Sequence, residues 1–120
     1  GEASNDAAQK INAARAEEDK KVAEAQANFL KIREDYRHQI TQDLVSTDKD
    51  IADLEAKSKT ATGKTKAQID AALPGIHTMR ENVSSEYKAL EFSSAVSWDS
   101  AKANVDKAYD DLKKAVSKAD

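Results

Sequence analysis

The stretch from Asn5 to about Thr60 contains no proline and no glycine, and its apolar residues recur at the spacing of an α-helix. The only proline is Pro74, and the two internal glycines are Gly63 and Gly75. A helix of about 55 residues is about 80 Å long, well beyond the usual length in globular proteins. Most of a 120-residue chain must then fold along this helix, so the pattern predicts an elongated all-α protein with a very long first helix.

Composition narrows the class of protein. Charged residues make up 34% of the chain, and the mean hydropathy of −0.77 is typical of helices with a narrow apolar stripe. The net charge is −3 and no basic face stands out, which argues against a nucleic-acid partner. The chain has no cysteine, which excludes disulfides and thiol chemistry, and it has no apolar run long enough to span a membrane.

The predicted first helix changes character along its length. Residues 5–28 are rich in alanine, and the large apolar residues among them are Ile11 and Val22. Together with two alanines they form a narrow stripe, which we name the seam and regard as the candidate interaction surface: Ile11, Ala14, Val22 and Ala25. From Phe29 onward, large residues spaced three, four or seven apart predict a core face: Phe29, Ile32, Tyr36, Ile40, Leu44, Ile51 and Leu54. Ser4, Asn5 and Asp6 are candidate caps for the start of this helix.

The second helix is predicted over residues 65–91, after a turn at residues 60–64. Gly63 can adopt the left-handed backbone that ends a helix, and Thr65 to Gln68 matches a capping box. A turn at Pro74 is the alternative, which we disfavour because residues 55–68 hold no large apolar side chain to cover the other helices. With the turn at Gly63, Pro74 is expected to kink the second helix. The expected buried face is Ile69, Leu73, Ile76, Val83, Tyr87 and Leu90.

The third helix is predicted over residues 97–119, with Ser93, Ser94 and Ser97 as candidate caps and Val96 packed on its first turn. Its expected face is Trp98, Ala101, Val105, Ala108, Leu112, Ala115 and Ala119, widened by Tyr109 and Val116. Short connections make successive helices antiparallel neighbours. We therefore predict one domain over 1–120, an elongated antiparallel three-helix bundle or coiled coil in which Leu73 and Val116 lie near Ile51, with residues 1–28 as a projecting extension.

No residue pattern points to catalysis or to a cofactor. His38 follows Glu34 by four residues and His77 precedes Glu81 by four, whereas helical di-metal sites use Glu-x-x-His. His77 is expected to face the Asp48 region of the first helix. The sequence therefore predicts no catalytic, cofactor-binding or metal site. Carboxylates are instead expected in ion pairs along one helix, such as Glu17–Lys21 and Asp53–Lys57.

Residues 98–115 read WDSAKANVDKAYDDLKKA. This segment resembles the C-terminal end of small uncharacterised bacterial Ala/Lys/Glu-rich coiled-coil proteins, with the pattern W-x-x-A-K-x-x-V-x-x-A-(W/Y)-x-x-L-K-x-A. The resemblance covers the second half of the chain and implies no activity. It implies a bacterial, periplasmic or envelope-associated protein, with a cytoplasmic location as the alternative. The chain starts at Gly1, so a cleaved tag or an omitted signal peptide is a further hypothesis.

Together these patterns predict a non-enzymatic helical scaffold or protein-interaction module. An isolated alanine-rich helix is marginally stable in water, so residues 5–28 either fray, pair with a second copy as a homo-oligomer, or dock on another helical protein. The alternative function is an amphipathic lipid-surface or stress-protective protein that makes peripheral contact with lipid.

Overall fold

The computed structural model describes residues 2–120, and the side chains of residues 5–120. The hypotheses about Gly1 and about the Ser4 side chain concern groups outside these described parts. Three helices are present, α1 (Glu2–Thr60), α2 (Gly63–Glu91) and α3 (Trp98–Ala119), and the described residues contain no strand. The predicted all-α class with a very long first helix is confirmed. Because α1 begins at Glu2, Asn5 and Asp6 lie inside the helix and do not cap it.

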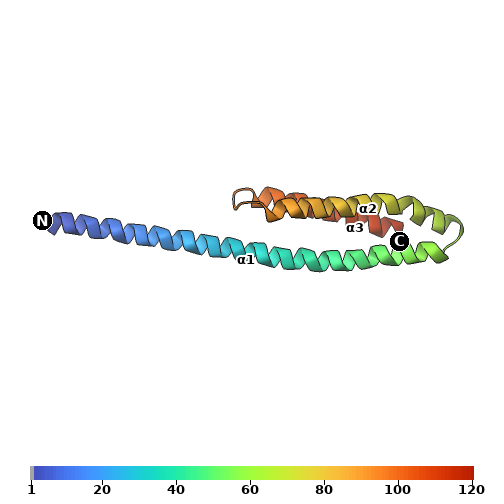
Figure 1. The fold of residues 1–120 in the computed structure, drawn as a ribbon, viewed down its shortest axis with the longest axis horizontal. Helices are drawn as coiled ribbons and strands as arrows, with labels where there is room; N and C mark the ends of the chain where they lie inside the picture. Colours follow the sequence, from blue (N-terminus) through green and yellow to red (C-terminus); the bar gives the residue numbers. More distant parts are fainter. Residues whose placement is uncertain (1) are drawn as a thin grey trace. The chain divides into compact units, whose positions relative to one another are not determined.

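The chain divides into two compact units, Gly1–Thr41 and Gln42–Asp120. The first unit consists of the earlier part of α1. The second unit contains the last part of α1, which packs with α2 and α3 as a helical bundle (Figure 1). Its core includes Ile51 and Val116, and Leu73 packs against this core.

Two helices of the second unit carry buried residues at every seventh position. The fully buried side chains of α2 are Ile69, Ile76, Val83 and Leu90, and those of α3 include Trp98, Val105, Leu112 and Ala119. Half-buried residues stand three and four positions after them. This is the repeat of coiled-coil packing. The faces predicted for the second and third helices are confirmed, since each of their members is buried or half-buried.

The core face of α1 differs from the prediction at three positions. Thr47 and Ser58 are buried, with exposed fractions of 4% and 8%, whereas Ile32 is 54% exposed. An α-helix turns about 100° per residue, so Ile32 points about 80° away from the buried Ile40, whereas Arg33 lies within about 20° of it. Arg33 is accordingly half-buried. Position around the helix, rather than hydrophobicity alone, decides which side chains are covered.

The turn between α1 and α2 lies at Ala61 and Thr62. The Ala61 N–H still donates to the Lys57 carbonyl at 2.8 Å, and Thr62 is extended at φ −134° and ψ 166°. Gly63 has the positive φ expected of it, +61°. The predicted capping box is wrong: α2 begins at Gly63, its N-cap residue is Thr62, and Thr65 lies inside the helix.

Pro74 lies inside α2, and every residue from 63 to 91 is helical. The alternative turn at Pro74 is therefore wrong. Proline has no N–H to donate to the carbonyl four residues earlier, so the helix continues through it with one bond fewer. The Thr78 hydroxyl donates to the Pro74 carbonyl at 3.1 Å.

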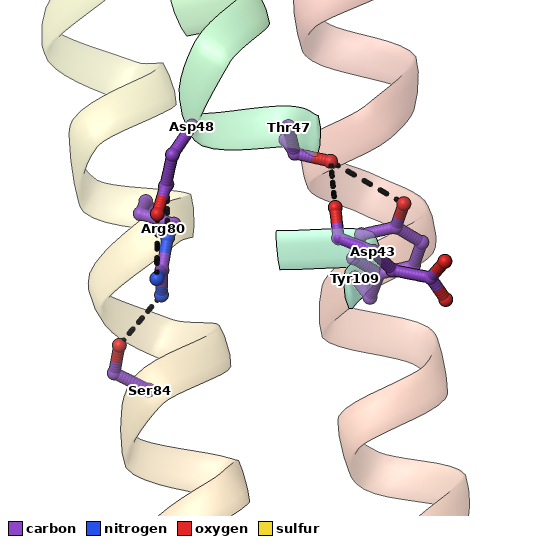
Figure 2. Close-up of polar contacts among 6 residues, drawn as sticks. All are labelled: Asp43, Thr47, Asp48, Arg80, Ser84 and Tyr109. Carbon is purple, nitrogen blue, oxygen red and sulfur yellow. Dashed lines mark hydrogen bonds and ion pairs between the residues drawn. The ribbon is translucent and has the colours of Figure 1, made fainter. Parts of the chain in front are cut away.

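Polar contacts join the last part of α1 to α2 and α3 (Figure 2). The Arg80 guanidinium makes two bonds to the Asp48 carboxylate, with Nε–Oδ1 at 2.6 Å and Nη2–Oδ2 at 3.1 Å, and Nη1 donates to Ser84 at 2.7 Å. On the other side, the Thr47 hydroxyl donates to the Asp43 carbonyl at 2.9 Å and lies 3.3 Å from the Tyr109 hydroxyl. These contacts explain how a threonine occupies a core position: its hydroxyl has partners, so its burial leaves no polar atom unsatisfied.

A second polar cluster lies beside the α1–α2 turn. The Ser58 hydroxyl donates to Asp70, and Lys66 Nζ lies 3.1 Å from the other oxygen of that carboxylate. Lys66 also donates to the Ser58 carbonyl at 3.0 Å. The Ser58 hydrogen bond, and after it the one from Lys66, hold the pKa of Asp70 below its ordinary value.

The connection between α2 and α3 contains two exposed apolar side chains, Phe92 at 84% and Val96 at 96%. Val96 therefore does not pack on the first turn of α3, and that prediction is wrong. Of the three candidate caps, Ser97 is the N-cap residue of α3, but its side chain makes no capping bond. Its hydroxyl instead accepts a hydrogen bond from the Ser94 N–H at 3.0 Å.

Candidate interaction surface

The seam lies on the part of α1 that belongs to the first unit. All four of its residues are exposed, and the large ones, Ile11 and Val22, are 53% and 55% exposed. At about 100° per residue, Ile11, Ala14, Val22 and Ala25 fall within about 80° of one another around the helix. The helix therefore brings the four together as one narrow exposed stripe.

Exposure along α1 changes sharply at one point. Every residue from 5 to 28 is exposed, whereas Phe29, Arg33 and Tyr36 are half-buried and Ile40 is 3% exposed. Phe29 lies five whole turns after Ile11, on the same line along the helix. The exposed seam is thus the first part of a stripe whose later part is covered.

Charged side chains border the seam on both edges. Arg15 and Asp19 lie along one edge, Glu17 and Lys21 lie along the other, and Glu18 lies within the stripe between Ala14 and Val22. All five are exposed.

The expected intrahelical pair Glu17–Lys21 is not formed. Among the side chains of residues 5–120, no ion pair or hydrogen bond involves Arg15, Glu17, Asp19 or Lys21. The charged groups at the edges of the seam are therefore available to a partner.

The other predicted ion pair and the histidine placement are also corrected. Lys57 lies 3.6 Å from Asp120 Oδ1 rather than pairing with Asp53. His77 Nε2 lies 2.9 Å from Glu55 Oε1, and the Asp48 region is occupied by Arg80. Glu55 follows Asp48 by two turns on the same face of α1, so the pattern alone allows either partner.

A groove between α2 and α3, of about 640 Å³, is lined mainly by polar and charged side chains, and its apolar lining residues are Met79, Ala108 and Ala115. Three of its charges are already paired within α3, since Lys107 Nζ lies 3.3 Å from Asp111 and Lys114 Nζ lies 2.8 Å from Asp110. The Asp110 contact raises the pKa of Lys114.

Among the described residues, no group of three or more histidine, aspartate or glutamate side chains is placed to hold a metal ion. None of the described helices combines the length and the apolar character needed to cross a bilayer.

Sequence reasoning missed the exposed pair Phe92 and Val96, because it assigned Val96 to packing and gave Phe92 no role. A phenylalanine followed by three serines within five residues is a signal of an exposed connection.

No protein-family model, no curated protein and no solved structure matches the chain. The resemblance of residues 98–115 to bacterial coiled-coil proteins stays a prediction.

Proposed function

We propose that this protein is a non-enzymatic helical scaffold or interaction module that associates with a second copy of itself through the seam. One observation carries the proposal: from residue 5 to residue 28 every side chain is exposed, and Ile11 and Val22 are aligned on one face. In Gln42–Asp120, by contrast, the apolar side chains of three helical segments form a shared core.

A helix with no neighbour depends on its own hydrogen bonds for stability. A helix of 24 alanine-rich residues gains little from its own hydrogen bonds, and helices in proteins are stabilised mainly by packing of an apolar face. Ala14 and Ala25 allow a second backbone to approach closely, and Ile11 and Val22 supply apolar surface for burial. Pairing of two seams therefore stabilises both helices at once.

Sedimentation equilibrium of the full chain, between about 10 μM and 1 mM, tests the proposal, because weak association is populated only at such concentrations. We expect the mass to rise from 13.1 kDa toward twice that value. The double variant Ile11→Asn/Val22→Asn should remain monomeric over this range.

A matched control is Leu30→Asn/Val45→Asn, which replaces two equally large residues that are 59% and 67% exposed and lie off the seam. This variant should associate like the original chain. A full chain that is monomeric at every concentration would contradict self-association, and equal loss in both double variants would contradict the role of the seam.

A lipid-surface function is the second candidate, supported by Phe92 and Val96, which are 84% and 96% exposed in the α2–α3 connection. An exposed aromatic side chain can enter the interface of a bilayer. Flotation with phosphatidylcholine vesicles, with and without phosphatidylglycerol, tests it, comparing Phe92→Ser with Leu30→Ser as the control. Lipid binding through this connection requires that only Phe92→Ser lowers flotation. If the original chain does not float with either vesicle, the lipid-surface function is wrong.

The proposed location is the bacterial periplasm or envelope, and its support is the resemblance of residues 98–115. Fractionation of cells that express the natural gene tests it: release of the protein with the periplasmic fraction is expected, and recovery with the cytoplasm would contradict the proposal.

A further inference from the structure

The residues of the seam are arranged symmetrically about Glu18. Ile11 and Ala25 lie seven residues on either side of it, and Ala14 and Val22 lie four residues on either side. When a second copy runs in the opposite direction with Glu18 at the centre, each large side chain faces an alanine: Ile11 meets Ala25, and Val22 meets Ala14. Large side chains opposite small ones fill the space between two closely spaced helices.

The charged edges follow the same symmetry. In an antiparallel pair of helices, each edge of the stripe meets the same edge of the second copy. One edge then brings Arg15 beside Asp19 of the second copy, and the other brings Glu17 beside Lys21 of the second copy. The two-fold axis repeats both contacts, which gives four edge pairs of opposite charge, although Asp19 and Glu17 each also lie within about 3 Å, along the axis, of the same residue in the second copy.

A parallel arrangement fits less well. In a parallel pair in register, opposite edges meet, and a residue lies near the one five positions later in the second copy. Lys10 would then lie beside Arg15 of the second copy, which places like charges together on both sides of the pair.

We infer that the seam is the interface of an antiparallel homodimer with its two-fold axis at Glu18, held by Arg15–Asp19 and Glu17–Lys21 pairs between the two copies. This inference rests on the proposed self-association and adds its direction and register. The five charged residues are exposed, and the four at the edges have no other partner among the described side chains.

Two charge variants test whether Arg15 pairs with Asp19 of the second copy. Arg15→Asp leaves acids at both 15 and 19, and Asp19→Arg leaves bases at both, so each variant alone should dimerise at least about tenfold more weakly by sedimentation. An equimolar mixture should recover the original association, because each chain then meets a partner of opposite charge. Pairing within one helix cannot produce this recovery on mixing.

Single cysteines test the direction independently, since the chain has none of its own. In the antiparallel dimer, Ile11 lies about 21 Å along the axis from Ile11 of the second copy, beyond the reach of a disulfide. Ile11→Cys should therefore not cross-link to itself, whereas a mixture of Ile11→Cys and Ala25→Cys should form the mixed disulfide. Far-UV circular dichroism and Trp98 fluorescence confirm that each variant keeps its fold.

Glu18 offers a third test, because in the proposed dimer it faces Glu18 of the second copy across the two-fold axis. Glu18→Gln removes this like-charge contact and should tighten the dimer at neutral pH, whereas Asp6→Asn, on an exposed residue outside the paired edges, should not.

The outcomes separate the two proposals. A monomeric original chain overturns both. A dimer whose Ile11→Cys variant cross-links to itself, or whose charge variants associate as tightly as the original, overturns the antiparallel arrangement and leaves self-association standing.

Discussion

The two internal glycines offer a test of where the chain turns. Gly63 has φ of +61° at the start of α2, whereas Gly75 lies in the helical backbone one residue after Pro74. Both are exposed, and a methyl group added at either would meet no atom within 4 Å. Replacing each by alanine therefore changes backbone energetics without a steric clash.

The expected effects have opposite signs. An L-residue in the left-handed region costs about 1–2 kcal/mol. Loss of freedom in the unfolded chain offsets about 0.4–1 kcal/mol of this cost, so Gly63→Ala should lower the free energy of unfolding by about 1 kcal/mol. Alanine is about 0.8–1 kcal/mol better than glycine within a helix, so Gly75→Ala should raise the free energy of unfolding by about that amount.

Urea unfolding followed by Trp98 fluorescence and by circular dichroism measures the difference. With a slope of about 2 kcal/mol per M, the midpoints of the two variants should differ by about 1 M. Gly63→Asn is a useful third variant, because asparagine tolerates the left-handed region and should lose less stability than alanine does. If Gly63→Ala stabilises the chain and Gly75→Ala destabilises it, the turn is at Pro74 and the assignment of α1 and α2 is wrong.

Three further predictions concern the second unit and its surface. Leu112 is fully buried, so Leu112→Ala should cost about 3 kcal/mol of unfolding free energy in urea titrations, whereas Leu30→Ala, at a site 59% exposed, should cost under about 0.5 kcal/mol; equal losses would contradict the assigned core. Arg80→Lys should cost about 1 kcal/mol, because lysine cannot reproduce the two bonds to Asp48, and adding salt should shrink the difference. The pKa of Asp70 is lowered in the folded chain, so its stabilising contribution is complete above the unfolded pKa of about 4 and is lost as the pH falls through the folded value; Asp70→Asn should flatten the acid limb of the stability curve, and an unchanged limb would contradict the Ser58 and Lys66 contacts.

Several parts of this structure are readable in the chain alone. The buried face of α2 is an example, because three of its large apolar residues stand seven positions apart: Ile69, Ile76 and Val83. Such a repeat specifies both a helix and the face that it buries. The positive φ of Gly63 was also predictable, because this glycine lies between the apolar repeats of the first and second helices, where the chain must turn. The exposed seam was also predictable, because residues 5–28 contain two large apolar side chains, too few to form a core.

Other features depend on contacts between helices. Thr47 and Ser58 hold core positions because Tyr109 and Asp70 supply partners for their hydroxyl groups, and a pattern of apolar residues contains no information about such partners. Likewise, two acids spaced seven apart on α1 are equivalent in sequence, and only the packed register gives one to His77 and the other to Arg80.

The sequence by itself therefore determined the helices, the faces of α2 and α3, and the uncovered seam, because each follows from spacing within one segment. The tertiary structure decided which polar residues are buried and which charges pair. These depend on distances between segments, and a shift of one helical turn, about 5.4 Å, leaves every local pattern unchanged while exchanging every partner.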